Sequence, residues 1–249
     1  MTVTACALVG AMSFAGTVAY LSDNEGTTNT FTVGKVQVDL TELDYPGNNS
    51  DEVKNLMPNK EVLKNPKVVN TGVNDAIIFT TVEVPVKNVT VVGTDGTKGT
   101  TEPTELFWFK QAADTHGTFA NNFNTTNWMQ LTSKETHGTT SDSTTTYVFA
   151  YKTAIAKDAE TDTLFDKVQL KNIIENEVTP GQVQDIKVKT YAIQASEVLD
   201  GDNDLTDTLD ETTLGKIYDI YLKQAGSADT KDADTSNVLN LKGTGHASV

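Results

Sequence analysis

The chain of 249 residues carries 19 basic and 34 acidic side chains, which gives a formal net charge of −15. All of the basic residues are lysines, and a field of this sign excludes nucleic acid as a partner and disfavours an anionic membrane surface. Hydrophobic residues make up 37% of the chain, which is enough for one core. Thr, Val and Asn are plentiful, and this composition favours strands and turns over helices.

The first 19 residues are small or apolar, carry no charge and end in Thr-Val-Ala, shortly before the polar stretch 22–25. This pattern is typical of a secretory signal peptide, which we expect to be cleaved after Ala19. The positively charged start of such a signal is expected upstream of Met1. The alternative is a retained membrane anchor, although the glycine, serine and threonine residues make the stretch weakly hydrophobic. Cys6 is the single cysteine, so the mature protein would contain no disulfide and no cysteine ligand.

Strand patterns follow along most of the chain, beginning with residues 31–40, which alternate from Val36 onward. The strongest pattern covers residues 76–92, where the missing N–H of Pro85 predicts a bend, an edge position or two separate strands. Residues 93–104 are predicted to form a loop, and residues 111–144 a long surface excursion. Further strands are predicted over residues 106–110, 145–151 and 185–195, and another after a short turn in 165–174.

One segment, residues 211–224, places its apolar side chains at helical spacing on a single face, which predicts a helix. Eight or nine short strands with one amphipathic helix indicate an all-β fold, a jelly-roll-like β-sandwich with one or two short helices and long surface loops. We expect a single domain over residues 31–224, preceded by an N-terminal arm over residues 20–30. Residues 225–249 are small and polar and are expected to form a flexible tail.

Histidine spacing argues against a zinc protease, because such a site needs two histidines one helical turn apart beside a general-base glutamate. The three histidines, His116, His137 and His246, are far apart and lie in polar sequence. Zinc proteolysis is therefore not predicted.

An acidic run over residues 200–211 resembles a calcium-binding loop, because its acidic residues fall at several of the ligand positions of an EF-hand. The candidate calcium ligands are Asp200, Asp202, Asp204 and Glu211. Leu205 stands where such a loop needs glycine, so the alternative is a solvated loop whose Asp210 or Thr212 caps the following helix. No other cofactor is expected.

Three stretches share motifs with a known family. Residues 16–40, GTVAYLSDNEGTTNTFTVGKVQVDL, contain a small-residue run, an aromatic-Leu-x-Asp element and Thr-Asn-x-Phe-x-x-Gly before the first strand. Residues 55–85, NLMPNKEVLKNPKVVNTGVNDAIIFTTVEVP, contain a Leu-x-Pro element in which Asn59 stands where the family usually has glycine. The third stretch is TLFDKV (163–168) with IKVKTYAIQA (186–195). In these motifs the chain resembles the TasA/camelysin family of secreted Gram-positive proteins.

The resemblance implies a jelly-roll fold, cleavage by a signal peptidase of the SipW type, and a secreted role in an extracellular biofilm-matrix fibre or at the cell surface. Fibres of this family are described as assembling by donor-strand exchange, so the resemblance implies a second copy of the chain as the partner, with an accessory matrix protein as a further expected partner. The arm would contribute apolar side chains, which we assign to Tyr20, Leu21, Phe31 and Val33. Residues 31–40 have an alternative role as the first strand of their own sheet.

Two other functions stay open from the sequence. One is a monomeric cell-surface adhesin or binding module that makes contact through residues 111–144. The other, less favoured, is a camelysin-like secreted metalloprotease.

Overall fold

The structure is a computed structural model, and it describes residues 36–48, 50–54, 56–137, 143–178, 185–199, 205 and 207–224, with the backbone alone for residues 132–137. All of these residues belong to one unit of the chain, residues 34–249. The helices are α2 (Asp51–Lys54) and α3 (Glu211–Gln224). The strands are β1 (Val38–Thr41), β2 (Glu61–Leu63), β3 (Lys67–Asn70), β4 (Ala76–Val92), β5 (Lys98–Glu105), β6 (Phe107–Lys110), β7 (Trp128–His137), β8 (Ser143–Tyr151), β9 (Lys167–Leu170) and β10 (Lys187–Gln194).

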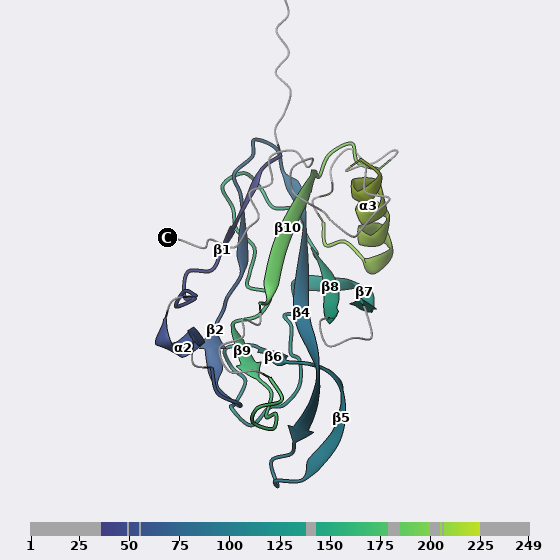
Figure 1. Ribbon diagram of the computed structural model, residues 1–249. Helices are drawn as coiled ribbons and strands as arrows, with labels where there is room; N and C mark the ends of the chain where they lie inside the picture. The colour runs from purple at the N-terminus through teal and green to yellow at the C-terminus, as the bar shows by residue number, and fades with distance from the viewer. Residues whose placement is uncertain are drawn as a thin grey trace, which may run out of the picture. The chain divides into compact units, whose positions relative to one another are not determined.

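The strands form three antiparallel sheets, and the predicted all-β fold is confirmed (Figure 1). The first sheet pairs β1 with β3, and the second has the order β2-β9-β6. The third and largest has the order β10-β4-β8-β7, with β5 also paired to β4. The predicted helix over residues 211–224 is present as α3. Within the described residues, no helix is long and apolar enough to span a membrane.

A single hydrophobic core joins the three sheets. Val38 of β1, Val168 of β9 and Ile78 of β4 come from different sheets and belong to the same buried cluster. Aromatic rings fill its centre: Phe109 stacks on Phe123 with ring centroids 4.9 Å apart and meets Phe165 edge-on at 4.8 Å. The sheets therefore pack as layers over one interior, as the sandwich prediction requires.

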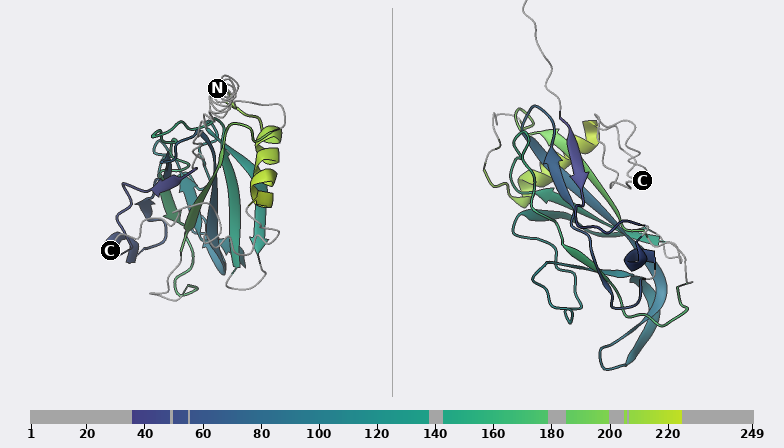
Figure 2. Two further views of the ribbon diagram at one scale, coloured as in Figure 1. Left: turned by 90° about the horizontal axis from the view of Figure 1, so that it is seen from above. Right: turned by 90° about the vertical axis from the view of Figure 1, so that its left-hand side faces the viewer.

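Helix α3 covers the outer face of the largest sheet. Phe79 of β4 packs against Tyr218 and Tyr221 of α3, with ring centroids 5.0 and 6.0 Å apart. In the view from above, α3 and β1 lie on opposite sides of this sheet (Figure 2). Strand β4 is therefore buried on both faces, which explains why it reads as a continuous apolar run instead of an alternating one.

Pro85 does not divide β4, so the expectation of two separate strands was wrong. The strand runs through residues 76–92 and changes its neighbour at the proline: Glu83 is the last residue paired with β10, and Val86 is the first paired with β5. The carbonyl of Pro85 accepts a hydrogen bond from the N–H of Leu106 at 3.0 Å. Because N–H and C=O of one strand residue point to the same edge, the missing donor lies where the two neighbours meet.

Two segments predicted as loops contain strands. Residues 93–104 hold most of β5, which forms with β4 a hairpin that projects from the sandwich (Figure 1). Residues 111–144 are more than a surface excursion, because Phe123 and Trp128 are buried and residues 128–137 form β7. Threonine-rich and asparagine-rich sequence concealed these elements, since their few apolar anchors are widely spaced.

Asn59 adopts a positive φ of 63°. Left-handed backbone favours glycine, and asparagine is among the residues that tolerate it best. The left-handed turn before β2 is therefore compatible with asparagine at this position.

Candidate functional site

Strand β10 is an edge strand of the largest sheet. Its eight residues pair in unbroken register with Ala76–Glu83 of β4, and among the described residues no strand pairs with its other edge. The N–H of Ala195, one residue after β10, donates to the carbonyl of Asp75 at 2.8 Å, directly before β4. This bond shows which residues of β10 direct their backbone N–H and C=O groups towards β4 and which direct them towards the outer edge. By alternation, the N–H and C=O groups of Val188, Thr190, Ala192 and Gln194 point to the outer edge.

Both faces of β10 are apolar enough to sit inside a larger sheet. Tyr191 packs against Tyr221 of α3 with centroids 5.5 Å apart, and burial raises the pKa of the Tyr191 hydroxyl. On the opposite face Val188 and Ala192 are buried in the core. A long, apolar edge strand is the form of edge to which another chain readily adds a strand. The edge of β10 is of this kind.

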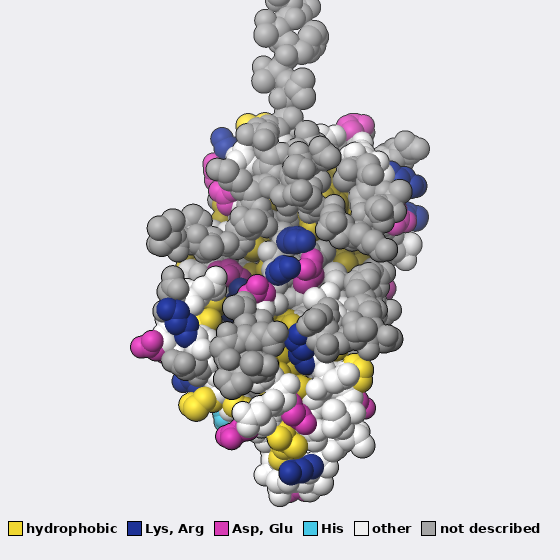
Figure 3. Space-filling view, viewed as in Figure 1, with side chains coloured by type: hydrophobic (Ala, Val, Ile, Leu, Met, Phe, Trp, Pro, Cys, Tyr) yellow, Lys and Arg dark blue, Asp and Glu magenta, His cyan; other side chains and the backbone are white. Residues whose placement is uncertain are grey.

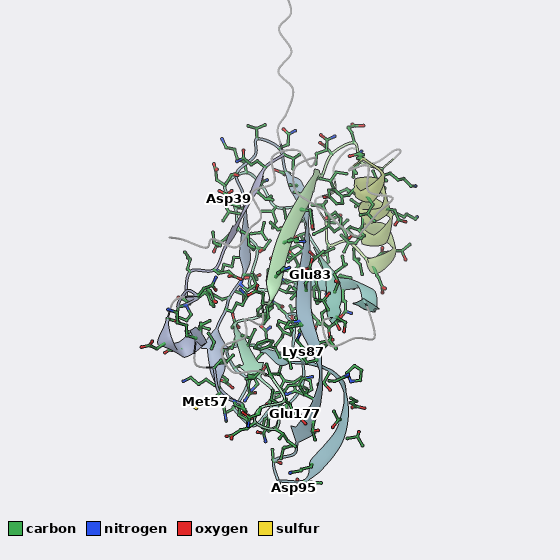
Figure 4. The ribbon with its side chains drawn as sticks, viewed as in Figure 1. Asp39, Met57, Glu83, Lys87, Asp95 and Glu177 are labelled. Atoms are coloured by element: carbon green, nitrogen blue, oxygen red, sulfur yellow. The ribbon has the colours of Figure 1, made fainter. Side chains whose placement is uncertain are left out.

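Charge near this edge is paired rather than concentrated. Glu83 of β4 accepts a hydrogen bond from Lys189 of β10 at 2.9 Å, and Glu83 is labelled beside β10 in Figure 4. Lysine and acidic side chains are interspersed over the described part of this face (Figure 3). A strand that approaches the edge therefore meets no uniform field of one sign.

The predicted donor-arm residues Tyr20, Leu21, Phe31 and Val33 lie outside the described residues, so their role stays a prediction. The same is true of the calcium candidates Asp200, Asp202 and Asp204. Glu211 is described and is the first residue of α3.

The helix after the acidic run is capped by Asp210. Its Oδ1 accepts a hydrogen bond from the N–H of Thr213 at 2.7 Å, and its carbonyl accepts one from Leu214 at 3.0 Å. The bond from Thr213 lowers the pKa of the Asp210 carboxyl. This is the geometry of an N-cap, which was the alternative interpretation for this end of the acidic run.

The residues around His116 do not fit a zinc ion. His116 Nδ1 lies 3.4 Å from Glu61 Oε1, but the same oxygen accepts a hydrogen bond from Lys110 Nζ at 2.8 Å. Lys167 Nζ lies 3.4 Å from the other oxygen. Two ammonium groups on one carboxylate leave no place for a divalent cation. In the described part of the chain, no three or more His, Cys, Asp or Glu side chains are grouped to hold a metal ion.

The Glu61 cluster and the free edge of β10 could not be found from the sequence. Glu61 and Lys110 lie 49 residues apart on β2 and β6, and become neighbours because both strands flank β9. The apolar pattern of residues 186–195 indicated a strand correctly, but no local signal shows that a strand lies at an edge. The absence of proline from β10 was the one hint that its outer edge is able to pair.

The family described as camelysin metallo-endopeptidase matches residues 1–101. This match confirms the resemblance to the TasA/camelysin family over residues 1–101. No curated protein and no solved structure matches the chain.

Proposed function

We propose that this protein is a secreted structural subunit of an extracellular matrix or cell-surface fibre, which assembles by donor-strand exchange. The N-terminal arm of one copy, residues 20–30 with Phe31 and Val33, adds as a strand to the outer edge of β10 in the next copy. Removal of residues 1–19 by a signal peptidase of the SipW type frees the arm. An accessory matrix protein is a further proposed partner, and no catalytic role is assigned.

The observation that carries this proposal is the outer edge of β10. It offers a row of four residues whose N–H and C=O groups face outward, on a strand buried on both faces. Phe31 and Val33 are two residues apart, so in an extended arm both side chains point to the same face. Main-chain hydrogen bonds would provide affinity, and pockets beside the edge would select alternate side chains.

The test is residue-resolved amide hydrogen exchange on the secreted protein before and after assembly, with electron microscopy of the same samples. Fibre formation should protect the amides of Val188, Thr190, Ala192 and Gln194. The amide of Tyr191 already points to β4 and should change little. If fibres form and these four amides gain no protection, the assignment of β10 as the acceptor strand is wrong.

The arm is tested by deletion and by peptide addition. A chain without residues 20–33 should stay folded and soluble but form no fibres. A synthetic peptide of residues 20–39 should restore the alternating protection on β10. The matched controls are the F31D/V33D peptide, which should not bind, and the T32D peptide, which should bind because residue 32 faces the other side. Fibres formed by the deleted chain would exclude exchange through this arm.

The same samples separate the two alternative functions. A full-length secreted chain that stays monomeric would favour a cell-surface adhesin. The family description makes proteolysis a second candidate. Casein cleavage that a chelator abolishes and zinc restores would support proteolysis and exclude a purely structural role.

A further inference from the structure

The β4–β5 hairpin contains the longest run of exposed residues in the described part of the chain, residues 93–103. Every residue of β5 from Lys98 to Pro103 is exposed, and the hairpin projects beyond the sandwich with Asp95 near its tip (Figure 4). Exposed hairpins rich in threonine are good templates for pairing between identical chains, because threonine favours strands and both outer edges carry unpaired backbone groups.

One outer edge of this hairpin, on the β4 side, is closed by the chain itself. The N–H of Val92 donates to the carbonyl of Asn172 at 2.7 Å, and the N–H of Ile174 donates to the carbonyl of Thr90 at 3.2 Å. Glu177 completes this contact, because its carboxylate accepts hydrogen bonds from the N–H and the hydroxyl of Thr90. Residues 172–177 thus occupy the place of a neighbouring strand.

The other outer edge belongs to β5, and Pro103 lies on it. The N–H of Leu106 points to β4, since it donates to Pro85, so by alternation Thr104 and Glu102 also point to β4. Thr101 and Pro103 therefore face outward. A close hydroxyl pair, Thr90 Oγ1 to Thr101 Oγ1 at 2.7 Å, agrees with this direction, because side chains approach most closely in pairs that share no backbone bond.

We infer that Pro103 prevents the hairpins of two copies from pairing through β5. Proline removes one outward donor, and its ring occupies the space into which a second strand would come. Strand β10 contains no proline, so its outer edge keeps all of its donors. The inference concerns β5 and holds whether or not the arm builds fibres through β10.

The test replaces Pro103 with threonine in the full chain. P103T restores the outward N–H and leaves an exposed residue of high strand propensity. We expect self-association of P103T that rises with concentration, measured by sedimentation velocity, and exchange of the Thr101 amide at least about tenfold slower, equivalent to about 1.4 kcal/mol. P103A should shift both quantities in the same direction by a smaller amount, because alanine favours strands less.

The matched control is T100V, which raises the apolar character of exposed β5 but adds no backbone donor; it should behave like the unchanged chain. Protection of the Tyr191 amide reports that each variant is folded. If P103T leaves Thr101 exchange unchanged at every concentration, the inference is wrong. That result would not affect assembly through β10, which is read from the Val188–Gln194 amides.

Discussion

Glu61 compensates the charge of a lysine that has no contact with bulk water. The Lys110 side chain is fully buried, and its Nζ donates to Glu61 and to the carbonyls of Thr115 and His116. Removing one partner of such a pair leaves a buried charge, which costs several kcal/mol. We expect Glu61→Gln to lower the free energy of unfolding by about 3 kcal/mol, measured by urea denaturation.

The control for this substitution is an exposed pair of the same length. Lys67 and Glu160 are also 2.8 Å apart, but both side chains are substantially exposed. Glu160→Gln should change the free energy of unfolding by less than about 1 kcal/mol. Equal effects of the two substitutions would show that burial of Lys110 is not the cause.

The Glu61 contact also makes stability depend on acidity. Burial alone raises the pKa of Glu61, but the hydrogen bonds and charges of Lys110 and Lys167 outweigh it and lower the pKa overall. A carboxyl with a lowered pKa in the folded state stabilises the protein above its ordinary pKa, and this contribution is lost as the pH falls through the lowered value. The difference between the unchanged chain and Glu61→Gln should therefore shrink in acid, measured by urea denaturation between pH 7 and pH 3. A difference that stays constant would contradict this origin.

At the scale of elements, the start of α3 provides a local test. Asp210 caps the helix, so Asp210→Ala should destabilise it by about 1 kcal/mol, seen as faster amide exchange in the first turns of α3. Asp207→Ala is the control, because it removes the same charge from an exposed position before the cap. Equal effects from both substitutions would indicate an effect of net charge instead of capping.

The sequence predicted where strands and helices lie better than it predicted which strands pair with each other. The 76–92 run, the 185–195 strand and the 211–224 helix were all recognisable, because each carries a dense apolar pattern. Strand β5 was not predicted, because residues Lys98–Pro103 are all exposed and form no apolar face. The effect of Pro85 was misjudged because the change of neighbour along β4 depends on pairing with distant segments.

For the candidate site, too, local sequence patterns predicted the strand but not the strands beside it. The strand character of residues 185–195 was predictable from composition, whereas the free edge of β10 depends on which strands the topology places beside it. Glu61, Lys110 and Lys167 come from three strands of one sheet, and their sequence spacing carries no sign of the contact. Edges and ion clusters are long-range properties, which local patterns do not encode.

For the whole molecule, the charge of −15 opposes association between copies. Assembly of the mature protein should accelerate as ionic strength rises, because the Debye length falls from about 30 Å at 0.01 M to about 8 Å at 0.15 M. Acidification towards the isoelectric point near 4.5 should act in the same direction. Light scattering measures the rate, and assembly that slows with added salt would contradict the electrostatic argument.

The same light-scattering experiment can also test calcium binding. If residues 200–211 bind calcium, millimolar calcium should accelerate assembly beyond sodium at matched ionic strength. The D202N/D204N variant removes two ligand charges and changes the net charge only from −15 to −13. Loss of the calcium effect in this variant would indicate a bound ion, whereas an equal response in both proteins would indicate general screening.

The unbroken register between β10 and β4 has a mechanical consequence. The hydrogen bonds of an antiparallel pair lie across the strands, so tension applied along β10 loads the bonds of its hydrogen-bonded register pairs with β4 together instead of one after another. Strand β4 continues past them for a total of 17 residues, about 55 Å, and is held by β8, β5 and α3. Tension on the edge strand is thus resisted in shear and transmitted to the centre of the domain.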